Sequence, residues 1–98
     1  MEFTFASADM ERLYTDLGFD GGFGRDIVRA YRKCMQQVRS AVNEKDLYAF
    51  RSRRFERLKG KRGHQHSLRL NDQWRLIVEI RKGSPNNTLH IVGIEDYH

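Results

Sequence analysis

Cysteine and proline are nearly missing from this 98-residue sequence, which contains one of each, and no apolar run reaches the length of a membrane span. A transmembrane helix needs about 20 consecutive apolar residues, so the sequence predicts no membrane partner. The first residues lack the basic start and the continuous apolar stretch of a secretory signal. Because the single Cys34 has no partner for an internal disulfide, we expect a protein of the reducing cytoplasm.

Groups that bind metals or nucleotide phosphates are also sparse. His64 and His66 stand two residues apart, but no second cluster of histidine, cysteine or carboxylate follows at metal-ligand spacing. The glycine-rich stretch 21–24 lacks the lysine and the serine or threonine of a P-loop. Cys34 falls on an apolar helical face, which favours packing into the core over nucleophilic attack. The sequence therefore predicts neither a metal site nor a cofactor.

Positive charge is in excess and is concentrated in one segment. The 18 lysine and arginine residues exceed the 13 acidic residues by five, which favours a polyanionic partner such as a nucleic acid or a ribosome. Segment 51–62 contains a single acid, Glu56, among seven basic residues: Arg51, Arg53, Arg54, Arg57, Lys59, Lys61 and Arg62. A solvated loop has a similar composition, but acids are common elsewhere in the chain and nearly absent here, which indicates a phosphate-binding surface.

The first half of the chain has a mainly helical pattern. Residues 3–5 alternate apolar and polar side chains as in a short strand, and Ser7 or Asp9 can cap a helix that continues to about residue 17. Over residues 25–43, apolar side chains recur every three or four positions, which predicts an amphipathic helix with its apolar stripe in the core. The apolar patch 47–50 is expected to cover an edge of that core.

In the second half the apolar period changes to two, which predicts β-strands, and the register of the first hairpin can be argued. Pairing Leu70 opposite Trp74, across a loop of residues 71–73, keeps the apolar side chains on one buried face. A two-residue turn would mix apolar and charged side chains on both faces. The hairpin therefore predicts that Arg69 and Arg75 lie side by side on the open face of the sheet.

These elements predict a single α+β domain over residues 1–98. It consists of a short N-terminal strand, two helices and an antiparallel meander of three strands, the last of them near residues 88–94. Both helices are expected to pack on one face of the sheet, because each has one apolar stripe to bury. The other face remains available for polar side chains.

Polar residues of the second half suit a site that cleaves RNA. Attack by the 2′-hydroxyl on the adjacent phosphate needs a base, cations that stabilise the phosphorane, and an acid that protonates the departing 5′-oxygen. Lys59, Arg69 and Arg75 can supply the cations, and the planar fork of Arg75 on a rigid strand can hold two phosphate oxygens. The candidates for proton transfer are Asp96, Tyr97 and His98, of which the histidine titrates near neutral pH.

Three motifs of this half resemble the HigB branch of the RelE/ParE toxin superfamily. They are FERLKG at residues 55–60, SLRLNDQWRL at 67–76 and EDYH at 95–98. The helical first half is similar in layout and length, so the resemblance spans the chain while its specific motifs cover about residues 55–98. It implies a RelE-like fold and a type II toxin that cleaves translated mRNA on the ribosome, without a metal.

The resemblance also implies roles for single residues. Lys59 and Arg75 would hold and neutralise the scissile phosphate, and the last three residues, from Asp96 to His98, would form the acid/base end of the site. Many HigB-like toxins place a histidine where this chain has Glu56. Glu56 is then a candidate general base, with His98 as the alternative.

His64 and His66 are weaker candidates for that role, because His66 is in phase with the apolar strand residues and is expected to point to the core. Basic residues around the centre are expected to bind the RNA backbone: Arg54, Arg57, Lys61, Arg62 and Arg69. The implied partners are a HigA-like helix-turn-helix antitoxin, the ribosome and mRNA, with operator DNA reached only through the antitoxin complex.

Two other functions remain open at this level. A toxin of the same fold can act by binding, as the gyrase-poisoning ParE branch does, but such a toxin has no need of Lys59 together with the terminal Asp-Tyr-His. A non-catalytic RNA- or ribosome-binding module would use segment 51–62 and would keep its effect in a His98→Ala variant. The nuclease hypothesis predicts that this variant loses cleavage and still binds ribosomes.

Overall fold

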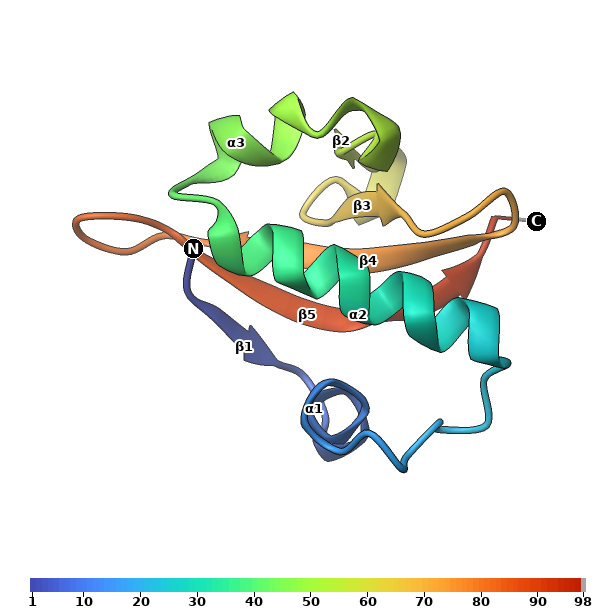
Figure 1. Cartoon of the computed structure of the whole chain (residues 1–98). Helices are drawn as coiled ribbons and strands as arrows, with labels where there is room; N and C mark the ends of the chain where they lie inside the picture. Colours follow the sequence, from blue (N-terminus) through green and yellow to red (C-terminus); the bar gives the residue numbers. More distant parts are fainter. Residues whose placement is uncertain (98) are drawn as a thin grey trace.

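The computed structural model describes residues 1–97 of the chain. Within these residues it contains three α-helices, two short 3-10 turns and five β-strands (Figure 1). In chain order they are β1 (Phe3–Phe5), α1 (Ala8–Thr15), α2 (Arg25–Ser40), α3 (Glu44–Ala49), η1 (Arg51–Arg53), β2 (Glu56–Arg57), η2 (Gly60–Arg62), β3 (His66–Arg69), β4 (Trp74–Arg81) and β5 (Thr88–Asp96).

The strands form one mixed sheet in the order β1-β5-β4-β3-β2. The antiparallel meander β3-β4-β5 confirms the expected hairpins. Two features differ from the sequence-based expectation, because β1 pairs in parallel with β5 and β2 adds a fifth strand inside the basic segment. A strand of two residues has no periodicity of its own, so only its pairing with β3 defines it.

The helices begin and end at recognisable caps. Ser7 caps α1, since its Oγ accepts from the N–H of Met10 at 3.2 Å, as its position predicted. The main helix α2 ends at Ser40, three residues before the expected end at 43. Asn43 instead caps a third helix, α3, by accepting from the N–H of Lys45 at 3.0 Å. The patch 47–50, interpreted as an edge cover, is therefore largely helical.

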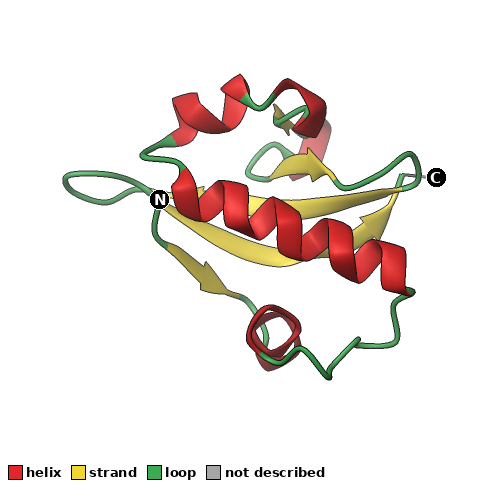
Figure 2. Ribbon diagram, in the orientation of Figure 1, coloured by secondary structure: helices red, strands yellow, loops and turns green. Residues whose placement is uncertain are grey.

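The core lies between the helices and one face of the sheet, as expected of an α+β domain (Figure 2). The apolar stripe of α2 packs there with Leu13 of α1 and Leu47 of α3, against Leu68, Leu76 and Ile91 of the sheet. Cys34 is fully buried in this core, and burial raises the pKa of its thiol to about 11. The thiol is therefore protonated at neutral pH and serves packing.

No helix in residues 1–97 combines the length and the apolar character that crossing a bilayer requires.

A buried hydrogen bond joins the first two helices and allows a test of the packing. The hydroxyl of Tyr31, at 0 % exposure, donates to the carbonyl of Met10 at 3.0 Å. Tyr31→Phe should lower the free energy of unfolding by about 1–2 kcal/mol, because the Met10 carbonyl loses its buried donor. Urea unfolding measures the effect. Tyr14→Phe is the control, since Tyr14 packs through its ring against Phe3; an equal loss there would contradict the assignment.

Candidate active site

The candidate site lies on the face of the sheet that points away from α2. The β3–β4 hairpin has the predicted register, with Arg69 opposite Arg75 and the N–H of Leu70 donating to the carbonyl of Trp74 at 2.9 Å. Side chains alternate along a strand, so Leu76 faces the core and Arg75 faces the opposite side. The two arginines therefore lie side by side on the open face, as predicted.

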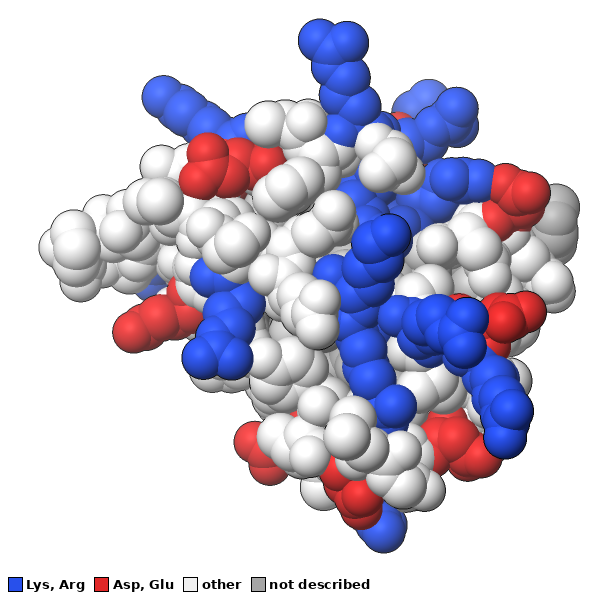
Figure 3. All heavy atoms as spheres, viewed as in Figure 1, with Lys and Arg blue, Asp and Glu red and all other residues white. Residues whose placement is uncertain are grey.

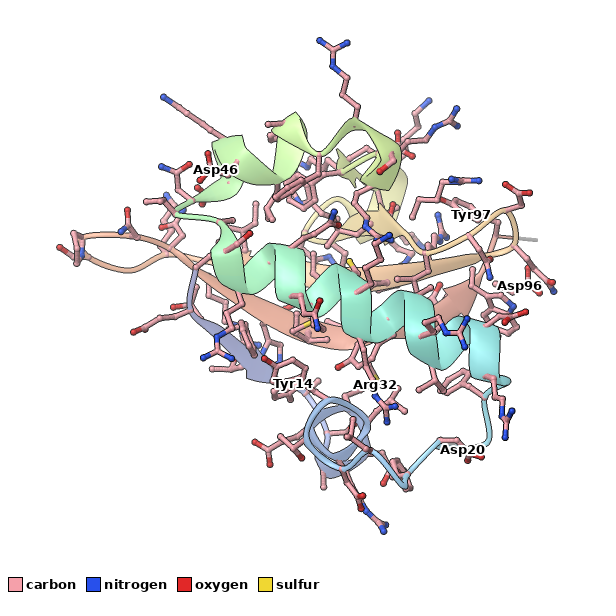
Figure 4. The ribbon with its side chains drawn as sticks, viewed as in Figure 1. Tyr14, Asp20, Arg32, Asp46, Asp96 and Tyr97 are labelled. Atoms are coloured by element: carbon pink, nitrogen blue, oxygen red, sulfur yellow. The ribbon has the colours of Figure 1, made fainter. Side chains whose placement is uncertain are left out.

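Strand β5 adds an acid and an aromatic ring to this pair. Glu95 pairs with Arg75 across the strands, and one of its carboxylate oxygens lies 3.8 Å from Nη2 of that arginine. Tyr97 follows two residues later, and its N–H donates to the carbonyl of Gln73 at 2.7 Å. The Cζ of Arg75 lies 5.2 Å from the centre of the Tyr97 ring, a cation–π distance. Figure 4 labels Tyr97 at the end of β5, beside the β3–β4 loop.

Arg75 is the most enclosed cation of the group. Its side chain is 20 % exposed, and within residues 1–97 its buried Nε has no hydrogen-bond partner. A buried donor without an acceptor is unusual in a folded protein. The guanidinium is thus held in place by its strand, by the ring of Tyr97 and by Glu95, with a donor still to be satisfied.

The turn η2 brings another arginine to the same face. Arg62 donates to both carboxylate oxygens of Glu95, at 2.9 and 2.7 Å, and its Nε donates to Gln65 at 3.0 Å. The hydrogen bond from Arg62, together with the charges of Arg62 and Arg75, lowers the pKa of Glu95 below its ordinary value. Glu95 is therefore ionised at neutral pH and is shared by two guanidinium groups.

An open hollow of about 770 Å³ lies next to these residues. It is lined by Arg51, Ser52, Arg54, Glu56, Arg69, Asp72 and Tyr97. Four of these were predicted as site residues: Arg54, Glu56, Arg69 and Tyr97. The carboxylate of Asp72 contacts the guanidinium of Arg69. Glu56 is exposed and, because it pairs with Ser67 on β3, points to the same face as Arg75.

Sequence reasoning did not single out four residues that the structure brings to this face: Arg51, Ser52, Asp72 and Glu95. Arg51 lies in the basic run, and Glu95 in the motif that carries the resemblance, so both had a weak signal. Asp72 also lies in one of the motifs of the resemblance, whereas Ser52 has no such signal, because its place in the hollow depends on how η1 packs against the hairpin.

Other predicted residues are not gathered at this centre. Arg57 and Asp96 alternate to the side of the sheet that faces α2, since they pair with His66 and Trp74. There Arg57 donates to the carbonyl of Gly63 at 2.5 Å, and Asp96 accepts from Gln73 at 2.9 Å.

Lys59 and Lys61 are exposed, one before η2 and one within it. His98, predicted to exchange protons, lies outside the residues that the structure describes.

The two neighbouring histidines are poorly suited to act as the base. The ring of His66 stacks on Phe55 with 4.8 Å between centroids, which confirms that it points to the core. Burial, with a contribution from Arg57, lowers its pKa below the ordinary value for histidine. His64 is exposed. In residues 1–97 no three histidine, cysteine or carboxylate side chains are placed so that they could hold a metal ion.

Positive charge also covers the helical side of the molecule. In Figure 3, lysine and arginine run down the middle of this face, over α2, and along its upper edge. One of the α2 cations has a structural role, since Arg32 donates to the carbonyls of Leu13, Asp16 and Phe19 at 3.1 Å each. The basic surface is therefore wider than segment 51–62 alone.

Comparison with known proteins agrees with the fold. The structure is similar to the YoeB/ParE toxin from Agrobacterium tumefaciens, with a TM-score of 0.60 and 13 % identity over 100 % of both chains. It is also similar to the solution structure of the conserved hypothetical protein HP0894 from Helicobacter pylori, with a TM-score of 0.55 and 10 % identity over 99 % of this chain and 94 % of that one. At such identities these likenesses concern the fold alone. No curated protein matches the sequence.

A family match covers nearly the whole chain. Residues 3–98 match the family described as HigB-like toxin, a RelE-like toxin of the type II toxin–antitoxin system HigB. The matched region includes every strand of the sheet and all residues of the candidate site. The chain therefore belongs to the HigB-like family of RelE-type toxins from type II toxin–antitoxin systems.

Proposed function

We propose that this toxin is an endoribonuclease that cleaves translated mRNA in the A site of the ribosome, without a metal. The observation that carries the proposal is the grouping of Arg69, Tyr97 and Glu56 around an open hollow of about 770 Å³, with Arg75 next to Arg69 and Tyr97 on the same face. A toxin that acts only by binding needs a basic surface, but it does not need a guanidinium enclosed beside an aromatic ring and a carboxylate.

The chemistry follows from these positions. Arg75 and Arg69 would bind the non-bridging oxygens of the scissile phosphate through the exposed parts of their planar forks. The Glu56 carboxylate would accept the proton of the 2′-hydroxyl, whose oxygen then forms a bond to phosphorus. The bond from phosphorus to the 5′-oxygen breaks, and Tyr97 or His98 would protonate the leaving oxygen. The products are a 2′,3′-cyclic phosphate and a 5′-hydroxyl.

Dependence on the ribosome fits the open shape of the site. The hollow is shallow, and Glu56 and the lysines of the η2 region are exposed, so a free RNA strand would be held loosely. Bound to the ribosome, the toxin would meet an mRNA already fixed in one conformation, which lowers the entropic cost of reaching the reactive geometry. Cations over α2 provide a second basic face for ribosomal RNA (Figure 3).

A type II toxin implies an antitoxin partner. We propose that it is a HigA-like protein with a helix-turn-helix, which would carry the toxin to operator DNA as part of the complex. An acidic or amphipathic surface on the antitoxin would complement the basic faces of this chain and keep it from the ribosome. The site of action of the free toxin is then the cytoplasm, where translation takes place.

Induced expression in bacteria tests the proposed activity. Wild-type protein and a His98→Ala variant are expressed, and the 5′ ends of cellular mRNAs are mapped against the reading frame. We expect in-frame cuts in translated messages with the wild type, few cuts with the variant, and binding of both proteins to ribosomes. Growth arrest without such cuts would contradict the nuclease and favour a toxin that acts by binding to the ribosome or to gyrase.

A further inference from the structure

Glu95, near the end of β5, contacts two arginines on the open face. It accepts two hydrogen bonds from Arg62 in a fork, and the same Oε1 atom lies 3.8 Å from Nη2 of Arg75. The three side chains come from three different elements, η2, β4 and β5, which are well separated in the sequence. Without an anion between them, two guanidinium groups at this spacing would repel each other.

We propose that Glu95 is a positioning residue that holds Arg62 and Arg75 at one point of the open face and so makes Arg62 a further cation for the scissile phosphate, beside Arg75 and Arg69. The inference rests on the proposed function, because the bound anion is the phosphate of the RNA. Glu95 itself does not touch the reacting atoms. It acts through the two arginines, whose planar forks it keeps oriented.

The geometry of Arg62 supports this role. Its Nε donates to Gln65 while both of its terminal nitrogens donate to Glu95, so the whole guanidinium plane is fixed. The side chain of Arg62 remains 41 % exposed and can still offer N–H donors to a ligand. Arg75, on β4, is more enclosed, with 20 % of its side chain exposed. A surface salt bridge with a purely structural role would not need a second arginine on the same carboxylate oxygen.

The arrangement affects ground-state binding and transition-state stabilisation in opposite ways. Two arginines and one carboxylate carry a net charge of +1, so Glu95 weakens the attraction for the singly charged phosphodiester in the ground state. In the transition state the phosphorane carries more negative charge, and aligned donors stabilise it most. Glu95 is therefore expected to raise both kcat and KM.

Kinetics of Glu95→Gln on programmed ribosomes test the proposal. The amide keeps the size of the side chain but loses the charge and the two-oxygen acceptor. We expect kcat to fall about 100-fold because the arginine forks lose alignment, while KM falls about 3-fold because one exposed negative charge is gone. Glu11→Gln is the matched control, since it removes the same charge from an exposed glutamate of α1, on the helical side of the sheet. Glu11→Gln should leave both constants within about 2-fold.

Three outcomes would overturn the inference: unchanged constants in Glu95→Gln, a similar loss of kcat in Glu11→Gln, or a rise in KM accompanied by a lower melting temperature in Glu95→Gln. The last would show that Glu95 only fastens η2 to the sheet. A double variant with Arg62→Gln adds a further criterion. If Glu95 acts through Arg62, the two losses in kcat should not multiply.

A second measurement separates this inference from the nuclease activity. The Nε–H signals of Arg62 and Arg75 are recorded by NMR in the free toxin, before and after Glu95→Gln. We expect both signals to shift and to exchange faster with solvent. A change at Arg62 alone would overturn the shared role, whether or not the protein cleaves RNA. If the wild type fails to cut mRNA on ribosomes, the proposed function fails and the NMR result still decides the positioning.

Discussion

Replacing Arg75 with alanine is expected to slow cleavage of ribosome-bound mRNA by about 1000-fold and to abolish growth arrest. Removal of one preorganised donor to a developing oxyanion typically costs about 100- to 1000-fold, and loss of an arginine at a transferring phosphoryl group costs about as much or more. Arg75 belongs at the upper end because, compared with Arg62 and Arg69 on the same face, its side chain is the most enclosed, at 20 % exposure.

Arg75→Lys separates charge from shape. Lysine keeps the positive charge but offers a single ammonium group in place of a planar fork, so it should restore only part of the activity, about 10-fold over alanine. Single-turnover cleavage of mRNA on purified ribosomes measures both variants. Their melting temperatures check that the loss is not one of folding.

Arg81→Ala serves as the control for Arg75. Arg81 lies on the same strand and, like Arg75, has a glutamate partner, but its side chain is 57 % exposed and far from Tyr97 along β4. We expect full cleavage with Arg81→Ala. Equal losses in the two variants would show that general surface charge, and not the geometry at Arg75, carries the effect.

The elements with one buried face could be predicted from the sequence. In α2 the apolar stripe recurs over four turns, and in the β3–β4 hairpin only one register keeps Leu70 and Trp74 on the same side. Burial of that one face determines that Arg69 and Arg75 point to the other. The orientation of these two arginines could therefore be predicted from local sequence patterns.

Short elements and partners distant in sequence could not be predicted. The two residues of β2 and the six of α3 are too few to show a period, and the parallel pairing of β1 with β5 joins opposite ends of the chain. The role of Glu95 could not be predicted either, because its main contact is with a residue distant in sequence. Its motif marks it as a neighbour of Tyr97, but nothing local indicates that Arg62, 33 residues earlier, donates to it in a fork.

Arg51, Ser52 and Arg54 line one wall of the hollow, and the buried Arg53 between them fastens this segment to the rest of the fold. Arg53 is 7 % exposed, and its Nε donates to Oε1 of Gln37 on α2 at 2.5 Å. Its Nη1 donates to the carbonyl of Arg69 at 3.0 Å. One guanidinium therefore ties η1 to both the main helix and the end of β3, next to the residues of the site.

Arg53→Met should lower the free energy of unfolding by about 3 kcal/mol. Two opposing terms decide the sign: removing a buried charge relieves a desolvation cost, but two acceptors lose hydrogen bonds to a charged donor, each worth about 1.5–3 kcal/mol. The second term should dominate, because the Arg69 carbonyl is fixed in the strand and cannot turn to water, whereas Gln37 can. Gln37→Leu, which leaves the bond to Arg69 intact, should therefore cost only about 1 kcal/mol.

Urea unfolding of these variants in an Arg75→Ala background measures the effect without toxicity to the host. A stability loss of about 3 kcal/mol corresponds to a melting temperature about 12–24 °C lower for a domain of this size. A loss below about 0.5 kcal/mol for Arg53→Met would contradict the role of the buried guanidinium. The loss should also reach the site, because Arg54 follows Arg53 with a left-handed φ of 46° and is turned by it toward the hollow. With η1 released, Arg51, Ser52 and Arg54 would no longer form one wall opposite Arg69, and RNA binding should weaken along with the fold.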